Sequence, residues 1–264
     1  MEIKGSVALI TGGGNGIGEA VAKFFAKHGA KVSIVDMEQK NIDRVVKEIK
    51  DMGGEVIGIQ ANVTSEAETA KFIKATLEAF GKLNIAVASA GIIRDGMMLT
   101  LDKETHKVSR KMGLDKWQPV IDVNLTGTFL TLRDAAEAMV NGGWEGLLVP
   151  ISSVNKVGQV GQINYSSTKV AAALLPKIMI GEFLMRGIRN IRCVGIAPGY
   201  TATTLLTGMN QDVLKALLED VHIGRLVDPN EIAALIGHCV ENGAIDATTL
   251  EITGGLCYPH GIAK

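Results

Sequence analysis

Short runs of hydrophobic residues alternate with longer amphipathic stretches along most of this chain. Continuous hydrophobic runs are typical of parallel strands that are buried on both faces, whereas the stretches between them have the hydrophobic period of helices. The pattern predicts an α/β fold, a single-domain, Rossmann-type doubly wound parallel sheet of about seven strands with helices on both faces. The runs that we assign to strands are 7–10, 31–35, 56–60, 85–88, 147–151, 191–196 and 250–253.

The helices are predicted from their periodicity and from the residues that begin and end them. Ser65 and Glu68 form a capping box that opens a helix, and Gly81 ends it. Pro229 after Asp228 begins the last long helix. The remaining predicted helices are 19–28, 39–52, about 116–140 and a stretch that ends near 186.

One segment departs from this alternation. Residues 97–101 and 107–112 are strand-like and flank Asp-Lys-Glu-Thr-His, so a β-hairpin is predicted at about 97–112. The chain contains no linker, repeat or low-complexity segment, and we therefore expect one domain over residues 1–264.

Composition and charge exclude several classes of protein. The chain is 47% hydrophobic and 21% charged, which suits a well-filled core. Its net charge of −1 gives no overall excess of positive charge of the kind that attracts nucleic acid. No hydrophobic run is long enough for a membrane span, and the first strand follows the start too closely for a signal peptide. Three scattered cysteines and five scattered histidines lack metal-ligand spacing. We expect a cytoplasmic protein with reduced, buried thiols and no metal.

A glycine-rich turn follows the first predicted strand. Glycines at 12, 13, 14, 16 and 18 precede the first helix, and Asp36 ends the second strand. Glycines let a diphosphate approach the helix N-terminus, where free N–H groups favour an anion. A carboxylate after the second strand binds the adenosine ribose of a dinucleotide and selects against a 2′-phosphate. The order of these elements argues against an ordinary glycine-rich turn and predicts a dinucleotide site.

Tyr165 and Lys169 form the second group of candidate residues. Positions i and i+4 of a helix share a face, so phenol and ammonium can reach one site. A nearby lysine favours the phenolate, which brings tyrosine closer to a useful acid or base at neutral pH. Ser153, upstream, could hold a substrate oxygen during the proton transfer.

With both groups of residues identified, the chain resembles the short-chain dehydrogenases/reductases. The family's Thr-Gly-x-x-x-Gly-x-Gly motif matches residues 11–18, and its Asn-Ser-Tyr-Lys set matches Asn124, Ser153, Tyr165 and Lys169. Pro198-Gly199 matches the family's Pro-Gly after the sixth strand. The segments 91–96, 161–162 and 223–225 are most similar to those of 3-oxoacyl-acyl-carrier-protein reductases.

This resemblance implies a role for each of the four matched residues. Tyr165 is expected to be the general acid of the reduction and the base of the oxidation. Lys169 is expected to lower the pKa of Tyr165 and to bind the nicotinamide ribose. Ser153 would hold the substrate oxygen, and Asn124 would order a water molecule in a proton relay.

The expected cofactor is NAD(H) rather than NADP(H), because Asp36 would repel a 2′-phosphate and Asn15 stands where NADP-dependent relatives place a basic residue. The residues expected to bind the cofactor are Gly12, Gly14, Asn15, Gly16, Ile17, Gly18, Asp36, Met37, Asn62, Val63, Ser89, Ala90, Gly91, Tyr165, Lys169, Pro198, Gly199 and Thr201.

The expected substrate is a small molecule with a secondary alcohol or a ketone, most similar to a 3-oxoacyl/3-hydroxyacyl thioester. An apolar lid over it is expected between Tyr200 and His222, including Met209. The residues expected to contact substrate are Ser153, Asn155, Gln162, Tyr165, Tyr200, Leu205 and Leu206. Another secondary or cyclic alcohol is the alternative substrate, and a non-catalytic cofactor-binding subunit is the alternative of another class.

The chain departs from the family pattern at three places. The family's Asn-Asn-Ala-Gly is Ala88-Ser89-Ala90-Gly91 here, and Asn62 replaces an aspartate, although its amide can serve the adenine edge. The hairpin at 97–112 is an insertion. Its excess of basic residues fits either an arm that attracts coenzyme A or an acidic carrier protein, or a solvated hairpin whose lysines prevent aggregation.

Two further expectations concern partners. We favour coenzyme A over acyl carrier protein as the carrier of the substrate, because residues 141–146 before the fifth strand contain Trp144 and Glu145 and no basic residue. A homo-oligomer, most simply a tetramer as in the family, is expected because residues 171–179 are apolar on most sides of their helix.

Overall fold

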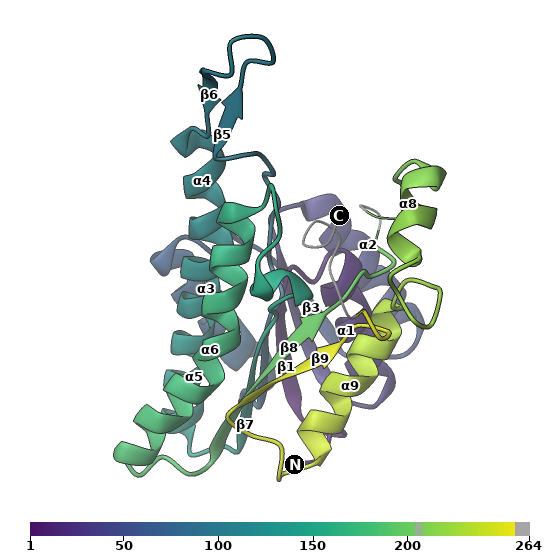
Figure 1. Ribbon diagram of the computed structural model, residues 1–264. Helices are drawn as coiled ribbons and strands as arrows, with labels where there is room; N and C mark the ends of the chain where they lie inside the picture. Colours follow the sequence, from purple (N-terminus) through teal and green to yellow (C-terminus); the bar gives the residue numbers. More distant parts are fainter. Residues whose placement is uncertain (204–205, 207, 257–264) are drawn as a thin grey trace.

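The computed structural model describes residues 1–203, 206 and 208–256. Seven parallel strands form one sheet in the order β3-β2-β1-β4-β7-β8-β9 (Figure 1). This arrangement confirms the predicted Rossmann-type doubly wound sheet. The strands are β1 (Val7–Thr11), β2 (Lys31–Asp36), β3 (Val56–Gln60), β4 (Ile85–Ala88), β7 (Gly146–Pro150), β8 (Ile191–Pro198) and β9 (Thr248–Ile252).

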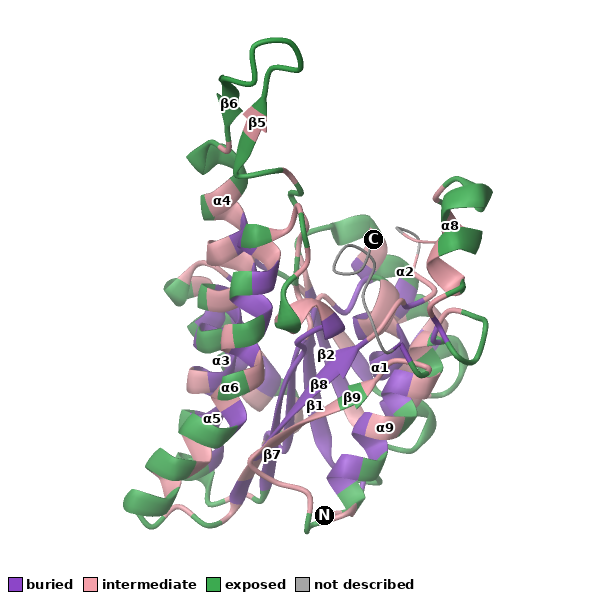
Figure 2. Cartoon of the chain, viewed as in Figure 1, coloured by how far each residue is buried: buried purple, intermediate pink, exposed green. Residues whose placement is uncertain are grey.

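Helices cover both faces of the sheet. One apolar core lies between the sheet and α1 (Gly16–Lys27), α2 (Gln39–Asp51) and α9 (Pro229–Glu241). The other core lies between the sheet and α3 (Glu66–Phe80), α5 (Thr128–Gly142) and α6 (Ile163–Met185). Figure 2 shows the central strands buried between these two layers, which is why their sequences are hydrophobic without alternation, whereas the edge strand β9 is only partly buried.

The predicted helix 116–140 is not one regular helix. It consists of α4 (Leu114–Ile121), a π-helical segment η1 (Asp122–Gly127) and α5. Gly127 ends the π segment against Val63, where a Cβ atom would lie 2.7 Å from the valine Cγ2. A π segment changes the hydrogen-bonding partners without breaking the apolar pattern, so the sequence could not reveal it.

Helix caps differ in detail from those expected. The Ser65 hydroxyl accepts a hydrogen bond from the Glu68 N–H at 3.3 Å, but the Glu68 carboxylate accepts from the N–H of Asn62 at 2.7 Å. The complete capping box is instead at the start of α9, between Asp228 and Glu231.

The segment for which a hairpin was predicted carries two short antiparallel strands, β5 (Leu99–Leu101) and β6 (Val108–Lys111). In Figure 1 this hairpin projects beyond α4 at the same end of the molecule as α8 (Gln211–Leu218). Figure 2 shows it almost wholly exposed.

Two of the three cysteines lie in the core. Cys193 and Cys239 are free and buried, as expected, and Cys257 lies outside the described residues. No helix in the described part of the chain is long and apolar enough to cross a bilayer.

Candidate active site

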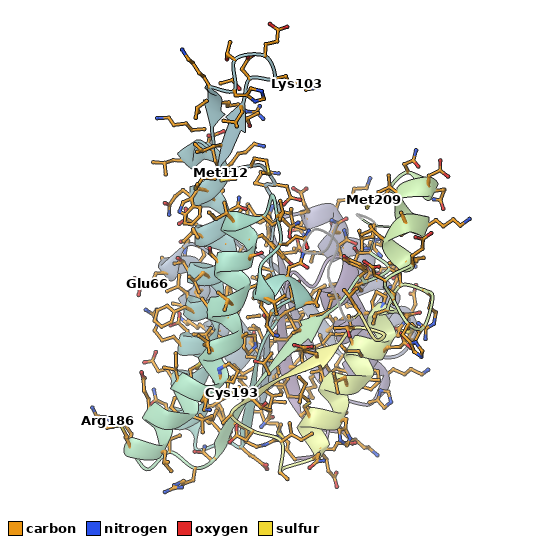
Figure 3. All side chains as sticks on the ribbon, in the orientation of Figure 1. Glu66, Lys103, Met112, Arg186, Cys193 and Met209 are labelled. Atoms are coloured by element: carbon orange, nitrogen blue, oxygen red, sulfur yellow. The ribbon has the colours of Figure 1, made fainter. Side chains whose placement is uncertain are left out.

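A cavity of about 680 Å³ lies at the carboxyl ends of the central strands. The glycine-rich turn, the residues after β4, β7 and β8, and the first turns of α6 line it. Ligands bind at this edge of open parallel sheets, where the connections diverge to opposite faces. In Figure 3, Met209, which lines the cavity, and Lys103 of the hairpin lie at this end of the molecule, whereas Arg186 lies at the other.

The glycine-rich turn is shaped by close contacts that only glycine allows. Gly12 has φ +65°, and a Cβ atom there would lie 2.9 Å from the backbone of Ala90. At Gly18 a Cβ atom would lie 2.1 Å from the carbonyl oxygen of Gly12. These contacts bring the N-terminus of α1 to the cavity, where Gly16 and Ile17 line it and an anion can accept hydrogen bonds from free N–H groups.

Asn15 and Asp36 flank this turn. The side chain of Asn15 caps α1 by accepting from the N–H of Gly16 at 2.7 Å. The Asp36 carboxylate accepts from the N–H of Gly14 at 3.0 Å and from that of Glu38 at 3.2 Å, and it lines the cavity. An acceptor-only group at the end of β2 suits ribose hydroxyls, which can donate to it.

Ser153, Tyr165 and Lys169 meet in the same cavity. Ser153 follows β7 and caps the short helix η2 (Val154–Val157) by accepting from the N–H of Asn155 at 3.1 Å. Lys169 is only 5% exposed, and its Nζ donates to the carbonyl of Ile151 at 2.8 Å. The Nζ lies 5.4 Å from the centroid of the Tyr165 ring.

The pKa values of the two ionisable groups are shifted in opposite directions. Burial raises the pKa of Tyr165; the hydrogen bond with Ser153 lowers it, and the negative charge of Asp95 raises it. Burial also lowers the pKa of Lys169 to about 8. The pKa of Tyr165 is therefore shifted upward, mainly by desolvation, and not downward as we expected from the neighbouring lysine.

Asn124 lies in η1 and is fully buried. Its Oδ1 accepts from the N–H of Ile92 at 2.8 Å, and its Nδ2 donates to the carbonyl of Ile92 at 2.9 Å. Because both ends of the amide bind this backbone, ordering a water molecule would fall to the main-chain carbonyl of Asn124, which already accepts from Thr128 Oγ1 at 2.8 Å.

The expected substrate residues are placed along one wall and the opening of the cavity. Asn155, Gln162, Tyr200 and Leu206 line it, together with Ser153 and Tyr165. Leu205 lies outside the described residues. Met209 and Leu217, from the expected lid, also face the cavity.

Five expected cofactor residues are not among those that line the cavity: Gly14, Gly18, Met37, Asn62 and Val63. Gly14 and Gly18 instead shape the turn. The Oδ1 atom of Asn62 accepts from the N–H and hydroxyl of Thr64 at 3.0 and 2.9 Å, which commits it to a local turn. Val63 is buried, and Met37 is 57% exposed.

Several residues that line the cavity were not predicted from the sequence. Ile93 and Asp95 fall in the segment 91–96, which was noted only for its resemblance to other reductases. The others lie within a few positions of Ser153 or Asn155, and this closeness in sequence was the only signal available for them. The residues that were not predicted are Ile93, Asp95, Ile151, Ser152, Val154 and Gln159.

The arrangement suits proton transfer beside a bound dinucleotide. A dinucleotide can lie across the glycine turn with its ribose at Asp36, while a buried phenol, a serine hydroxyl and an ammonium face the same space. No group of three His, Cys, Asp or Glu residues that could hold a metal ion occurs in the described parts of the chain.

Comparison with known proteins places the chain in a family. A family model described as short chain dehydrogenase matches residues 6–214. The chain is 34% identical over 266 residues to the (3R)-3-hydroxyacyl-CoA dehydrogenase of Homo sapiens, covering 96% of both proteins. It is 34% identical over 256 residues to a 3-oxoacyl-[acyl-carrier-protein] reductase of Synechocystis, covering 95% of this chain and 96% of that protein.

A relative with a cyclic substrate is equally similar. A 2,5-dichloro-2,5-cyclohexadiene-1,4-diol dehydrogenase of Sphingobium indicum is 35% identical over 256 residues, covering 96% of both proteins. The solved structure of a 7α-hydroxysteroid dehydrogenase complexed with NADH and 7-oxo glycochenodeoxycholic acid superposes with a TM-score of 0.85 at 27% identity, covering 96% of this chain and 95% of that one. The protein therefore belongs to the short-chain dehydrogenase family and is an oxidoreductase of CH–OH groups.

Proposed function

We propose that this protein interconverts a 3-hydroxyacyl and a 3-oxoacyl thioester with NAD(H) as its cofactor. The observation that carries the proposal is that Ser153, Tyr165 and Lys169 share one cavity with the glycine-rich turn and Asp36. When bound, the nicotinamide accepts a hydride from the alcohol carbon or returns it to the ketone carbon.

The residues of this chain handle the proton and the alignment. In oxidation, Tyr165 must act as the phenolate, which takes the proton of the substrate hydroxyl while the Ser153 hydroxyl holds the substrate oxygen. In reduction, the Tyr165 phenol returns the proton. The raised pKa of Tyr165 keeps the phenol protonated, as the reduction requires, and the Lys169 ammonium stabilises the phenolate that forms. Rigid elements hold all three groups, so alignment contributes to the rate.

Asp36 supports NAD(H) over NADP(H). Its carboxylate lines the cavity at the end of β2, where a 2′-phosphate would face a like charge. The Asn15 side chain is neutral and engaged in capping α1, so it supplies no cation for that phosphate. Turnover at limiting cofactor should favour NADH over NADPH by about a hundredfold; equal rates would exclude this preference.

Coenzyme A remains the carrier that we favour. The lack of basic residues at 141–146 no longer supports this choice when one chain is considered alone, because that segment lies far from the cavity. Residues 141–146 lead into β7, which begins at Gly146, at the end of the sheet opposite the cavity, and Glu145 lies 3.5 Å from the amino group of Met1. The remaining support is Asp36, since an NAD-dependent enzyme suits oxidation rather than synthesis on a carrier protein.

Replacing Tyr165 by phenylalanine tests the catalytic assignment. Tyr165→Phe should lower turnover more than about a hundredfold while thermal stability and NADH binding stay unchanged, because only the hydroxyl is removed. The measurement is steady-state oxidation of 3-hydroxybutyryl-CoA, with NADH affinity taken from fluorescence titration. A variant that retained a tenth of the wild-type rate would show that Tyr165 is not the acid/base group.

A cyclic secondary alcohol is the second candidate substrate. The polar side chains of Asp95, Asn155 and Gln162 line one wall of the cavity and could bind further hydroxyl groups of a ring. A screen of 3-hydroxyacyl-CoA thioesters against cyclic diols separates the two. A hundredfold preference for the diols would reject the thioester and keep the dehydrogenase assignment.

A further inference from the structure

A chain of hydrogen bonds leads from the cavity mouth to Ser153. Asp95, which follows β4, accepts at its Oδ2 from Nε2 of Gln162 at 2.9 Å. The Oε1 of Gln162 accepts from Nδ2 of Asn155 at 2.8 Å. The backbone N–H of Asn155 then donates to the Ser153 hydroxyl at 3.1 Å. All four residues line the cavity.

The carboxylate fixes the direction of this chain. A carboxylate only accepts hydrogen bonds, so the NH₂ end of Gln162 must face Asp95 and its oxygen must face Asn155. The NH₂ end of Asn155 is then turned to Gln162. Asn155 Oδ1 is left buried without a hydrogen-bond partner among the described residues, an arrangement that costs about 1–3 kcal/mol. Asp95 therefore sets the orientation of both side-chain amides, although this orientation leaves the Asn155 oxygen without a hydrogen bond among the described residues.

Asp95 itself is held at its backbone by two neighbouring elements. Its carbonyl accepts from Nζ of Lys116 at 2.7 Å. The N–H of the next residue, Gly96, donates to the carbonyl of Gly161 at 2.8 Å. These contacts tie the base of the hairpin to the loop that carries Gln162, so the carboxylate has a defined position despite its exposure.

The charged groups around Tyr165 come from two elements. Lys169 lies one turn further along α6, and Asp95 lies on the segment after β4, while Ser153 contributes a neutral hydroxyl after β7. The negative charge of Asp95 favours the protonated phenol and so opposes the effect of the ammonium.

We propose that Asp95 is a positioning residue of this active site, which orients the amides of Gln162 and Asn155 and thereby the Ser153 hydroxyl that holds the substrate oxygen. The proposal rests on the function proposed above, in which Ser153 and Tyr165 act on the substrate. The same carboxylate lines the cavity together with Tyr165, so its negative charge also acts on the phenol there.

Two variants separate orientation from charge. Asp95→Asn removes the charge and lets the amide chain reverse, whereas Gln162→Ala breaks the chain and keeps the charge. Both should lower kcat/KM for the alcohol about tenfold and leave the KM for NAD within about twofold, because the dinucleotide lies elsewhere in the cavity. Only Asp95→Asn should move the apparent pKa of the pH–rate profile, and the displacement should be downward because a negative charge is removed.

The matched control is Asp102→Asn. Asp102 is an exposed aspartate of the hairpin whose carboxylate accepts hydrogen bonds from Thr105. Among the described residues, none that lines the cavity is hydrogen-bonded to the Asp102 carboxylate. This variant should keep wild-type kcat/KM and an unchanged profile. Wild-type kcat/KM in Asp95→Asn would overturn the positioning role, and an equal pKa displacement in both aspartate variants would overturn the charge effect.

A titration without turnover separates failure of this inference from failure of the proposed function. Tyrosinate absorbance, measured as the difference between each protein and its Tyr165→Phe counterpart, reports the ionisation of Tyr165 alone. The Tyr165 pKa should fall in Asp95→Asn and stay in Gln162→Ala and Asp102→Asn. An unchanged value in Asp95→Asn would reject the coupling even if no substrate were turned over. If the wild-type protein turned over none of the substrates but the Tyr165 pKa still fell in Asp95→Asn, only the proposed function would be rejected.

Discussion

Lys169 shows how a single residue can serve the site at a cost to stability. Its side chain is 5% exposed and hydrogen-bonds to one carbonyl, so its charge is held in a poorly solvated place. Burial lowers its pKa from the usual 10.5 to about 8. Below pH 8 the folded protein therefore carries a desolvated ammonium, which the proposed chemistry needs next to Tyr165.

The buried ammonium predicts a particular dependence of stability on pH. Between the folded pKa of about 8 and the unfolded value of 10.5, the unfolded chain binds more protons, so the contribution of Lys169 to stability rises with pH. Lys169→Met should be more stable than the wild type by about 1–2 kcal/mol at pH 7, while losing activity and NADH affinity. Urea unfolding at pH 7 and 9.5 should show this difference shrinking. A difference that did not depend on pH would mean that Lys169 keeps its ordinary pKa.

Among the structural elements, the glycine-rich turn is held from both sides. The N–H of Gly14 is bound by Asp36, and its carbonyl accepts from Arg44 of α2 at 2.9 Å. Arg44 also donates to the Glu19 carboxylate at 2.8 and 2.6 Å, which joins α2 to the start of α1. A planar guanidinium can make these contacts together, as a lysine cannot.

Removing the hydrogen bonds of Arg44 should weaken binding of the cofactor and leave binding of the alcohol unchanged. Arg44→Met should raise the KM for NAD about fivefold or more, with kcat and the alcohol KM within about twofold, because the turn loses its fixed shape. Lys47→Met, on the same helix and paired with Asp51, is the control. If Arg44 only linked the two helices, the variant would lower the melting temperature and leave the KM for NAD unchanged.

The hairpin is an element without a core of its own. Leu99, Leu101 and Val108 are 44%, 52% and 52% exposed, and the pairing of its two strands is internal. Such a hairpin adds little to the stability of the sheet. Of the two interpretations given above, we favour a solvated hairpin whose lysines prevent aggregation.

Shortening the hairpin tests that interpretation. Replacing residues 99–111 by a Gly-Ser-Gly linker should change the melting temperature by less than about 3 °C and kcat/KM for a small alcohol by less than about threefold. The KM for 3-hydroxybutyryl-CoA should also be unchanged at low salt. A rise in that KM that disappears with added salt would instead favour the basic arm that attracts phosphates.

Across the molecule as a whole, α6 exposes an apolar strip. Its buried side packs on the sheet through residues such as Ala172 and Leu175. On the other side, large apolar residues recur at helical spacing and are 41–85% exposed: Ile163, Val170, Leu174, Ile178 and Met185. A continuous apolar strip of this kind is typical of a surface that another molecule covers.

We predict that a second copy of this chain covers this strip, in a homo-oligomer that is most simply a tetramer. Leu174→Glu combined with Ile178→Glu should shift the protein to a smaller species, because charge cannot be buried in such an interface. Light scattering after size exclusion measures the mass of each species. Lys47→Glu, on the exposed side of α2, is the control and should not change it. A wild-type protein with the mass of one chain, 27.9 kDa, would contradict the prediction.

Local sequence is enough to predict the sheet, the glycine-rich turn and the meeting of Tyr165 with Lys169. Each depends on residues a few positions apart: hydrophobic runs for strands buried on both faces, glycines before a helix, and a four-residue spacing on one helix face. Local patterns of this kind survive in any tertiary context that buries them.

Interactions between residues that are far apart in the sequence were decided only by the tertiary structure. Asp95 and Gln162 are 67 positions apart, and the Asn124 amide is bound to Ile92, 32 positions away. The same holds for the loop before β7, which lies opposite the cavity, and for Tyr165, whose pKa burial raises although a lysine lies one helical turn away. Hydrogen bonds, burial and electric fields depend on which segments the connections bring together, and no local pattern records that.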